Sequence, residues 1–107
     1  MPCGAAAIEL LDALGVTADT DSLESSVRGV ATRLRLGEAD AGIVYRTDVA
    51  ESDGALVAIA DDAPDSVGSV SYMAAVLTGE SGGAALLDYI SRGPGQRLLS
   101  TRGFGPP

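Results

Sequence analysis

The chain has 107 residues, enough for one domain at most, and 46% of them are hydrophobic, which suffices for an ordinary core. Its net charge is −8, and its seven basic residues are scattered arginines, which argues against a nucleic-acid partner and an anionic membrane surface. One cysteine rules out an internal disulfide, the absence of histidine removes the commonest general base and metal ligand, and no apolar run approaches the ~18–20 residues of a membrane span.

The first element in chain order is a predicted helix over residues 5–14. Ile8, Leu11 and Leu14 fall three residues apart, so they share one face of a helix. Gly15 follows directly, and glycine at this position commonly ends a helix. We therefore expect a short amphipathic helix near the start of the sequence.

A second helix is predicted over residues 27–36, after a polar segment over 17–26. Ser25 or Ser26 is suited to cap its N-terminus, and Gly37 is suited to end it. The apolar residues within it recur at helical spacing: Val27, Val30, Ala31 and Leu34. This spacing predicts one buried face on the second helix.

Three apolar runs predict β-strands between and after the helices. They are continuous rather than alternating, which is typical of short strands buried on both faces. Their ranges are 41–45, 55–60 and 70–77, with a turn or brief helix beginning at Thr47-Asp48 and an acidic loop over 61–68. Helices that alternate with buried strands indicate an α/β fold with a largely parallel sheet.

Two further helices are predicted at the C-terminal end, over 84–90 and 94–102. Pro94 is suited to the first turn of the last helix, and Gly103 is suited to end it. A turn over 78–83 separates these helices from the preceding strand. The sequence contains no internal repeat and no low-complexity linker.

Helix starts and one strand end are the candidate binding positions. The backbone N–H groups at Pro2-Cys3-Gly4 and after Ser25-Ser26 would lie at the positive ends of helix dipoles, which suit an anion. Tyr45 would place a phenol hydroxyl at the carboxyl end of a buried strand, where α/β proteins commonly bind ligands. Taken alone, each feature is more typical of an ordinary helix end or a core tyrosine.

No arrangement of side chains typical of an enzyme is present. Cys3 and the serines have no histidine partner for nucleophilic catalysis. The spacing of Asp61, Asp62 and Asp65 matches no calcium loop and favours a solvated acidic loop. We therefore predict a binding protein that is not an enzyme, with no cofactor and no protein-coordinated metal.

Five short motifs follow one another along the chain. They are Pro2-Cys3-Gly4, Ser26-Val27-Arg28-Gly29, Gly42-Ile43-Val44-Tyr45, Tyr72 before Ala74-Ala75-Val76-Leu77, and Gly103-Phe104. This order resembles the periplasmic molybdate-binding proteins, the substrate-binding components of molybdate ABC transporters. The resemblance runs through essentially the whole chain, although Pro-Cys-Gly stands where Pro-Ala-Gly is usual in that family.

The resemblance implies a type II periplasmic-binding fold, in which two α/β lobes hold an oxyanion in the cleft between them. It implies molybdate or tungstate as the ligand, held by neutral donors: the amides of Cys3 and Val27 and the hydroxyl of Tyr45. It also implies delivery to the membrane permease of an ABC transporter and a periplasmic or cell-surface location, although this sequence contains no signal peptide.

The resemblance also predicts which part of the family fold is present. Family members are considerably longer, so residues 1–70 would be a second-lobe portion, and residues 71–107 a crossover with helices that pack on the first lobe. Met1 stands where valine is common in the family, so we expect an N-terminally truncated member. Two serine-bearing loops that complete the oxyanion cage would be missing, and we expect weak or no molybdate binding by this chain.

Two other interpretations remain open at the level of sequence. The chain could be a related lobe that binds another anion, such as sulfate or a small organic anion. It could instead be a stand-alone interaction domain whose last helices, over 84–102, pack on a partner. Size-exclusion chromatography tests whether the last helices expose apolar faces, because such faces favour self-association and a clean monomer would argue against them.

Overall fold

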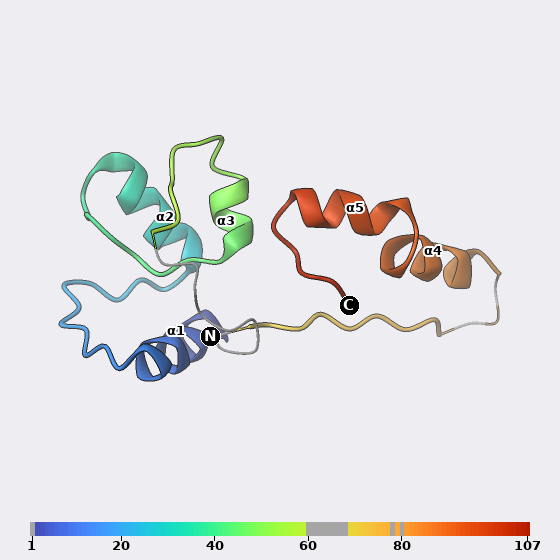
Figure 1. The fold of residues 1–107 in the computed structure, drawn as a ribbon, viewed down its shortest axis with the longest axis horizontal. Helices are drawn as coiled ribbons and strands as arrows, with labels where there is room; N and C mark the ends of the chain where they lie inside the picture. Colours follow the sequence, from blue (N-terminus) through green and yellow to red (C-terminus); the bar gives the residue numbers. More distant parts are fainter. Residues whose placement is uncertain (1, 60–68, 78, 80) are drawn as a thin grey trace. The chain divides into compact units, whose positions relative to one another are not determined.

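The computed structural model describes residues 2–59, 69–77, 79 and 81–107 (Figure 1). The chain divides into two compact units, Met1–Val70 (unit 1) and Ser71–Pro107 (unit 2). Within the described residues, unit 1 contains three helices and unit 2 contains two. None of these helices has the length and apolar character that crossing a membrane requires.

Helix α1 spans Pro2–Leu14 and opens unit 1. It begins three residues before the predicted start, and proline is well tolerated in the first turn because its missing N–H has no partner there. Gly15 ends the helix with a φ of 64°, a conformation that glycine adopts without strain. The Val16 N–H donates to the Leu11 carbonyl at 2.9 Å, which closes the last turn. The predicted helix and its glycine stop are confirmed.

Helix α2 spans Val27–Leu36, the bounds predicted from the sequence. Ser26 is the N-cap, and its side chain accepts a hydrogen bond from the Gly29 N–H. Gly37 ends the helix in the left-handed conformation, with φ 70°. Ala31 is buried on the predicted apolar face, which places the interior of unit 1 against this helix.

Arg33 connects the two ends of α2 to the segments that flank the helix. Its guanidinium pairs with Glu24 before the helix and with Glu38 after it, the latter at 3.3 Å. Ser22 donates a hydrogen bond to Glu24 at 2.7 Å. The hydrogen bonds from Ser22 and Arg33 hold the pKa of Glu24 below its ordinary value of 4.5. A cation in the last turn also interacts favourably with the helix dipole.

The segment after α2 packs directly on that helix. A Cβ atom at Gly42 would lie 2.6 Å from Val30 Cγ1 and 3.2 Å from Leu34 Cδ1, so only glycine fits there without displacement. The strand predicted over 41–45 is not formed, and these residues are irregular. A strand needs hydrogen bonds from a neighbouring strand, and the described residues contain no strand that could supply them.

Helix α3 spans Arg46–Ala50 and realises the brief helix expected near Thr47-Asp48. The buried Ser52 follows it and fixes the next turn. Its hydroxyl donates to the Val49 carbonyl at 2.7 Å and accepts the Leu56 N–H at 3.0 Å. The strand predicted over 55–60 is absent from residues 55–59, and Ala60 lies outside the described residues.

Unit 2 is built around a pair of packed helices, α4 over Ser81–Ser91 and α5 over Pro94–Thr101. The two predicted C-terminal helices are confirmed, with α4 starting three residues early and Pro94 in the first turn of α5. Gly95 is buried at their junction, where a Cβ would lie 2.7 Å from the Tyr89 ring and 2.8 Å from its carbonyl oxygen. The close approach of the two helices therefore depends on glycine at this position.

The segment before α4 is also irregular, although a strand is predicted over 70–77 (Figure 1). Met73 is 97% exposed and Leu77 is 95% exposed, so these side chains contribute to no core. The Tyr72 ring meets the Phe104 ring edge-on, with centroids 6.1 Å apart, which connects the segment to the chain end after Gly103.

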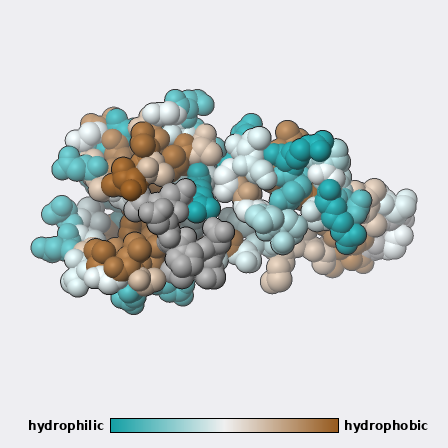
Figure 2. Space-filling model, in the orientation of Figure 1, coloured by the Kyte–Doolittle hydropathy of each residue, from teal (hydrophilic) through white to brown (hydrophobic). Residues whose placement is uncertain are grey.

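The described residues leave much apolar surface uncovered. Figure 2 shows brown apolar patches on the visible face, and no large side chain among the described residues is fully buried. The α/β assignment is therefore not confirmed, because the described elements are all helical. The predicted acidic loop over 61–68, including Asp61, Asp62 and Asp65, lies outside the described residues, as do Met1, Thr78 and Glu80.

Candidate functional site

Cys3 lies in the first turn of α1, as the sequence predicts for a helix start. The N–H groups of a first helical turn have no carbonyl partner within the helix, so the Cys3 amide is of the type that can bind an anion. The side chain is a half-buried free thiol. Gly4 beside it is exposed, and a Cβ there would meet nothing within 4 Å.

Val27 is the first residue of α2, directly after the Ser26 cap. The Ser26 side chain accepts the Gly29 N–H at 3.2 Å, and its carbonyl accepts the N–H groups of Gly29 and Val30 at 3.0 and 3.4 Å. The Val27 amide makes no hydrogen bond within the described part of the chain. The cap thus satisfies the Gly29 and Val30 amides and leaves the Val27 amide available.

Tyr45 occupies the N-cap position of α3 rather than the end of a strand. Its backbone is extended, with φ −78° and ψ 155°, and the residue is half-buried. The Tyr45 N–H donates to Asp48 Oδ2 at 2.9 Å, so the third residue of the helix holds the residue that precedes it. The tyrosine is thereby fixed by its own helix instead of by a sheet.

The three predicted donors share one unit and one kind of position. Cys3, Val27 and Tyr45 all belong to unit 1, and each lies where a helix begins. Helix starts orient backbone N–H groups outward, away from the helix that follows. Cys3 and Val27 thus lie at helix starts as the sequence predicts, whereas Tyr45 lies at a helix start and not at the predicted strand end.

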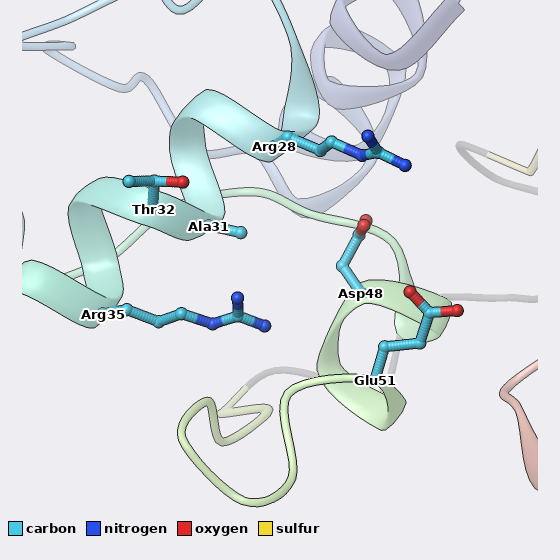
Figure 3. Close-up of a pocket in the computed structure, with 6 residues that line it drawn as sticks. All are labelled: Arg28, Ala31, Thr32, Arg35, Asp48 and Glu51. Carbon is cyan, nitrogen blue, oxygen red and sulfur yellow. The ribbon is translucent and has the colours of Figure 1, made fainter.

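A cavity of about 320 Å³ lies between α2 and α3, and sequence analysis did not identify it. Arg28 and Arg35 extend from α2 toward α3, where Asp48 and Glu51 form the facing wall (Figure 3). Ala31 and Thr32 complete the lining. The sequence did contain one indication of this cavity, the spacing of its residues. Arg28, Thr32 and Arg35 fall on one helical face, and so do Asp48 and Glu51.

The cavity contains charges of both signs, which determines the kind of ligand that it could bind. The carboxylates of Asp48 and Glu51 would repel a doubly charged oxyanion, while Arg28 and Arg35 would attract it. No ion pair joins the two walls among the residues that the structure describes. The cavity is therefore a mixed-charge surface between two helices and not a simple anion pocket.

The described residues contain no candidate metal site. No group of three or more Cys, Asp or Glu side chains gathers in a way that could hold a metal ion in the ranges described. The groups predicted to bind an anion, two amides and a phenol hydroxyl, are neutral. Neutral donors suit an anion that must be desolvated without a matching cation.

Comparison with known proteins relates these features to a family. A profile described as bacterial extracellular solute-binding protein matches residues 1–105. The chain belongs to this family. The match includes residues of both units.

Proteins named molybdate-binding protein ModA are among the relatives. Those of Mycobacterium bovis and of two strains of Mycobacterium tuberculosis are 32% identical to this chain over 111 residues. The alignment covers 100% of this chain and 42% of each relative, so the chain spans less than half the length of the curated relatives it matches. No solved structure matches the chain.

Proposed function

We propose that this chain takes part in capturing a tetrahedral oxyanion, molybdate or tungstate, for an ABC transporter. Membership of the extracellular solute-binding family and similarity to ModA proteins support a transport role outside the cytoplasm. The permease of the transporter would be the membrane partner, and the location would be periplasmic or at the cell surface. Capture involves no bond-breaking chemistry, so the chain would act as a binding protein and not as an enzyme.

The proposed donors are the amides of Cys3 and Val27 and the hydroxyl of Tyr45. The observation that carries this proposal is the Val27 amide, which the Ser26 cap leaves without a hydrogen-bond partner among the described residues. An amide at a helix start donates to an anion and lies at the positive end of the helix dipole. The matching position of Cys3 on α1 supports a second amide donor.

We further propose that the irregular segments 41–45 and 70–77 become strands in the complete family fold. Both are apolar runs, and Met73 and Leu77 are almost fully exposed in the described structure. Strands form only when a neighbouring strand takes up their backbone hydrogen bonds. The neighbours would come from parts of the α/β fold that lie outside these 107 residues.

The affinity of the 107-residue chain by itself should be low. Three charge-assisted hydrogen bonds contribute roughly 1.5–3 kcal/mol each. Lost translational and rotational freedom opposes binding by about 4 kcal/mol or more. The net binding free energy is therefore about −5 kcal/mol at most, and since about −4 kcal/mol corresponds to a Kd of about 1 mM, we expect roughly millimolar or weaker binding.

The proposal is tested by adding sodium molybdate to the isotope-labelled chain at neutral pH and following its amide and tyrosine ring resonances. We expect saturable shifts at millimolar molybdate for the Cys3 and Val27 amides and the Tyr45 ring. The Tyr45→Phe variant should weaken these shifts, and Tyr89→Phe is the matched control because that ring packs against Gly95 in unit 2.

Sulfate, added in parallel, distinguishes molybdate recognition from binding of tetrahedral dianions in general. Stronger shifts with sulfate than with molybdate would replace the proposed ligand. No saturable shift at the three donors with either anion would contradict the proposed site. Micromolar or tighter binding, measured by calorimetric titration, would contradict the proposal that these 107 residues supply only part of the donor set.

A further inference from the structure

Among the described residues, Asp48 both contacts the backbone of the proposed tyrosine donor and lines the charged cavity. Its carboxylate accepts the Tyr45 N–H at 2.9 Å, and its side chain also faces Arg28 and Arg35 across the space between α2 and α3. Asp48 is half-buried, which restricts the rotamers available to its short side chain. The carboxylate therefore acts on the Tyr45 backbone from a constrained position.

Tyr45 lies between two fixed points of unit 1. Three residues earlier, Gly42 packs so closely on Val30 that a Cβ would lie 2.6 Å from Val30 Cγ1. Three residues later, Asp48 holds the Tyr45 N–H. The second point fixes the peptide on the N-terminal side of Tyr45, while the Tyr45 carbonyl accepts the N–H groups of Asp48 and Val49 at 3.0 and 3.3 Å.

We infer that Asp48 is a positioning residue for Tyr45, fixing its backbone so that the phenol hydroxyl is presented to the bound oxyanion. The inference rests on the proposed function, since it concerns how one donor of that site is held. A direct contact between Asp48 and the ligand is excluded by charge, because a carboxylate repels a dianion. Asp48 acts through Tyr45 and not on the ligand.

The acceptor oxygen of Asp48, and not its charge, carries this role. Asparagine keeps an oxygen that accepts the Tyr45 N–H and loses the negative charge. Alanine loses both. Asp48→Asn should therefore preserve the hydrogen bond from the Tyr45 N–H and Asp48→Ala should remove it, while any electrostatic penalty of the carboxylate on anion binding is removed in both variants.

Glu51 provides the matched control on the same helix. It lines the same cavity and carries the same charge, but its side chain makes no hydrogen bond or ion pair within the described residues. Glu51→Ala removes one carboxylate from the cavity without touching the cap of α3. Any effect of cavity charge alone should therefore be equal in Asp48→Ala and Glu51→Ala.

The first measurement uses no ligand and records amide hydrogen exchange of Tyr45 in the 107-residue chain and its variants. We expect roughly ten-fold faster exchange in Asp48→Ala, since one hydrogen bond to a charged group is lost. Asp48→Asn and Glu51→Ala should remain within about two-fold of the unsubstituted chain. Equal exchange in Asp48→Ala and the unsubstituted chain would overturn the inference.

The second measurement adds inorganic molybdate and compares two donors within each variant. In Asp48→Ala, the shift of the Tyr45 ring at a fixed molybdate concentration should fall several-fold, while the Val27 amide still responds. A general loss of folding would abolish both responses, and circular dichroism would reveal it. An undiminished ring response in Asp48→Ala, or an equal loss in Asp48→Asn and Glu51→Ala, would overturn the positioning role.

The two measurements separate this inference from the proposed function. If neither Tyr45 nor Val27 responds to molybdate in the unsubstituted chain, the proposed oxyanion site fails, whatever the exchange data show. If both respond and Asp48→Ala changes neither exchange nor ring response, the site stands and the positioning role fails.

Discussion

Unit 1 and unit 2 fix their backbones by different means. In unit 1, side chains bond to the main chain at element ends: Ser26 caps α2, Asp48 holds Tyr45, and Ser52 secures the turn after α3. In unit 2, α5 begins at Gly93 without a side-chain cap, and Gly95 lies against Tyr89 instead. Side-chain hydrogen bonds thus hold the starts of α2 and α3 in unit 1, whereas close packing at Gly95 holds the start of α5 in unit 2.

The difference matters because a hydrogen-bonded cap fixes the direction of backbone groups, whereas packing fixes the distance between helices. Directed N–H groups are what an anion site needs. The proposed donors Cys3, Val27 and Tyr45 all lie in unit 1, and two of them, Val27 and Tyr45, lie at helix starts with hydrogen-bonded caps. Substitutions that remove packing in one unit and caps in the other test this comparison.

The largest effect is expected for Gly95→Ala in unit 2. The new Cβ would lie 2.7 Å from the Tyr89 ring and 2.8 Å from its carbonyl oxygen, and backbone cannot move aside as a flexible side chain can. We expect the free energy of unfolding to fall by about 3 kcal/mol, measured by urea denaturation with circular dichroism. Gly82→Ala is the control, because a Cβ there meets nothing within 4 Å and alanine favours the helix by up to about 1 kcal/mol.

A smaller loss is expected for Gly42→Ala in unit 1. Its Cβ would lie 2.6 Å from Val30 Cγ1, but the clash involves side chains and can be relieved in part. We expect a loss of about 1–2 kcal/mol in urea denaturation, with faster amide exchange confined to unit 1. Gly4→Ala serves as the control in open space within the same unit. Equal stability of Gly42→Ala and Gly4→Ala would contradict the conclusion that close packing at Gly42 stabilises unit 1.

The Ser26 cap should contribute about 1 kcal/mol. Ser26→Ala leaves the Gly29 N–H without its side-chain acceptor and should lower the unfolding free energy by that amount. Ser25→Ala is the matched control, since Ser25 is exposed and caps no helix. Similar stability of the two variants, measured by thermal unfolding, would show that polar caps do not distinguish unit 1.

The smallest effect concerns Glu24 and pH. Hydrogen bonds from Ser22 and Arg33 lower the pKa of Glu24 in the folded chain below 4.5, so ionised Glu24 stabilises the fold above that pH. This stability should decline as the pH falls below 4.5 and through the lowered folded-state pKa. Unfolding measured across that range should show a weaker pH dependence in Glu24→Gln. An unchanged pH profile would exclude this network as a support of α2.

The sequence by itself determined where the helices lie and those helix ends that carry a cap or a glycine stop. Ser26 and Gly37 set the bounds of α2, and Gly15 and Gly103 follow α1 and α5. These signals are local, because a cap or a left-handed glycine acts within one helical turn. The position of Val27 followed from the Ser26 cap, and Cys3, expected just before the first helix, lies in its first turn. The role of Cys3, Val27 and Tyr45 as donors remains a prediction.

Tertiary structure decided whether the apolar runs form strands and which elements pack against each other. The apolar runs over 41–45 and 70–77 predicted strands, but a strand depends on a partner that the run itself does not encode. Tyr45 consequently lies at the start of α3, held by Asp48, and not at a sheet edge. The packing of Gly42 on α2 and the charged cavity between α2 and α3 arise from contacts between separate elements. Helical spacing in the sequence indicates which cavity residues share a face, but not which element that face meets.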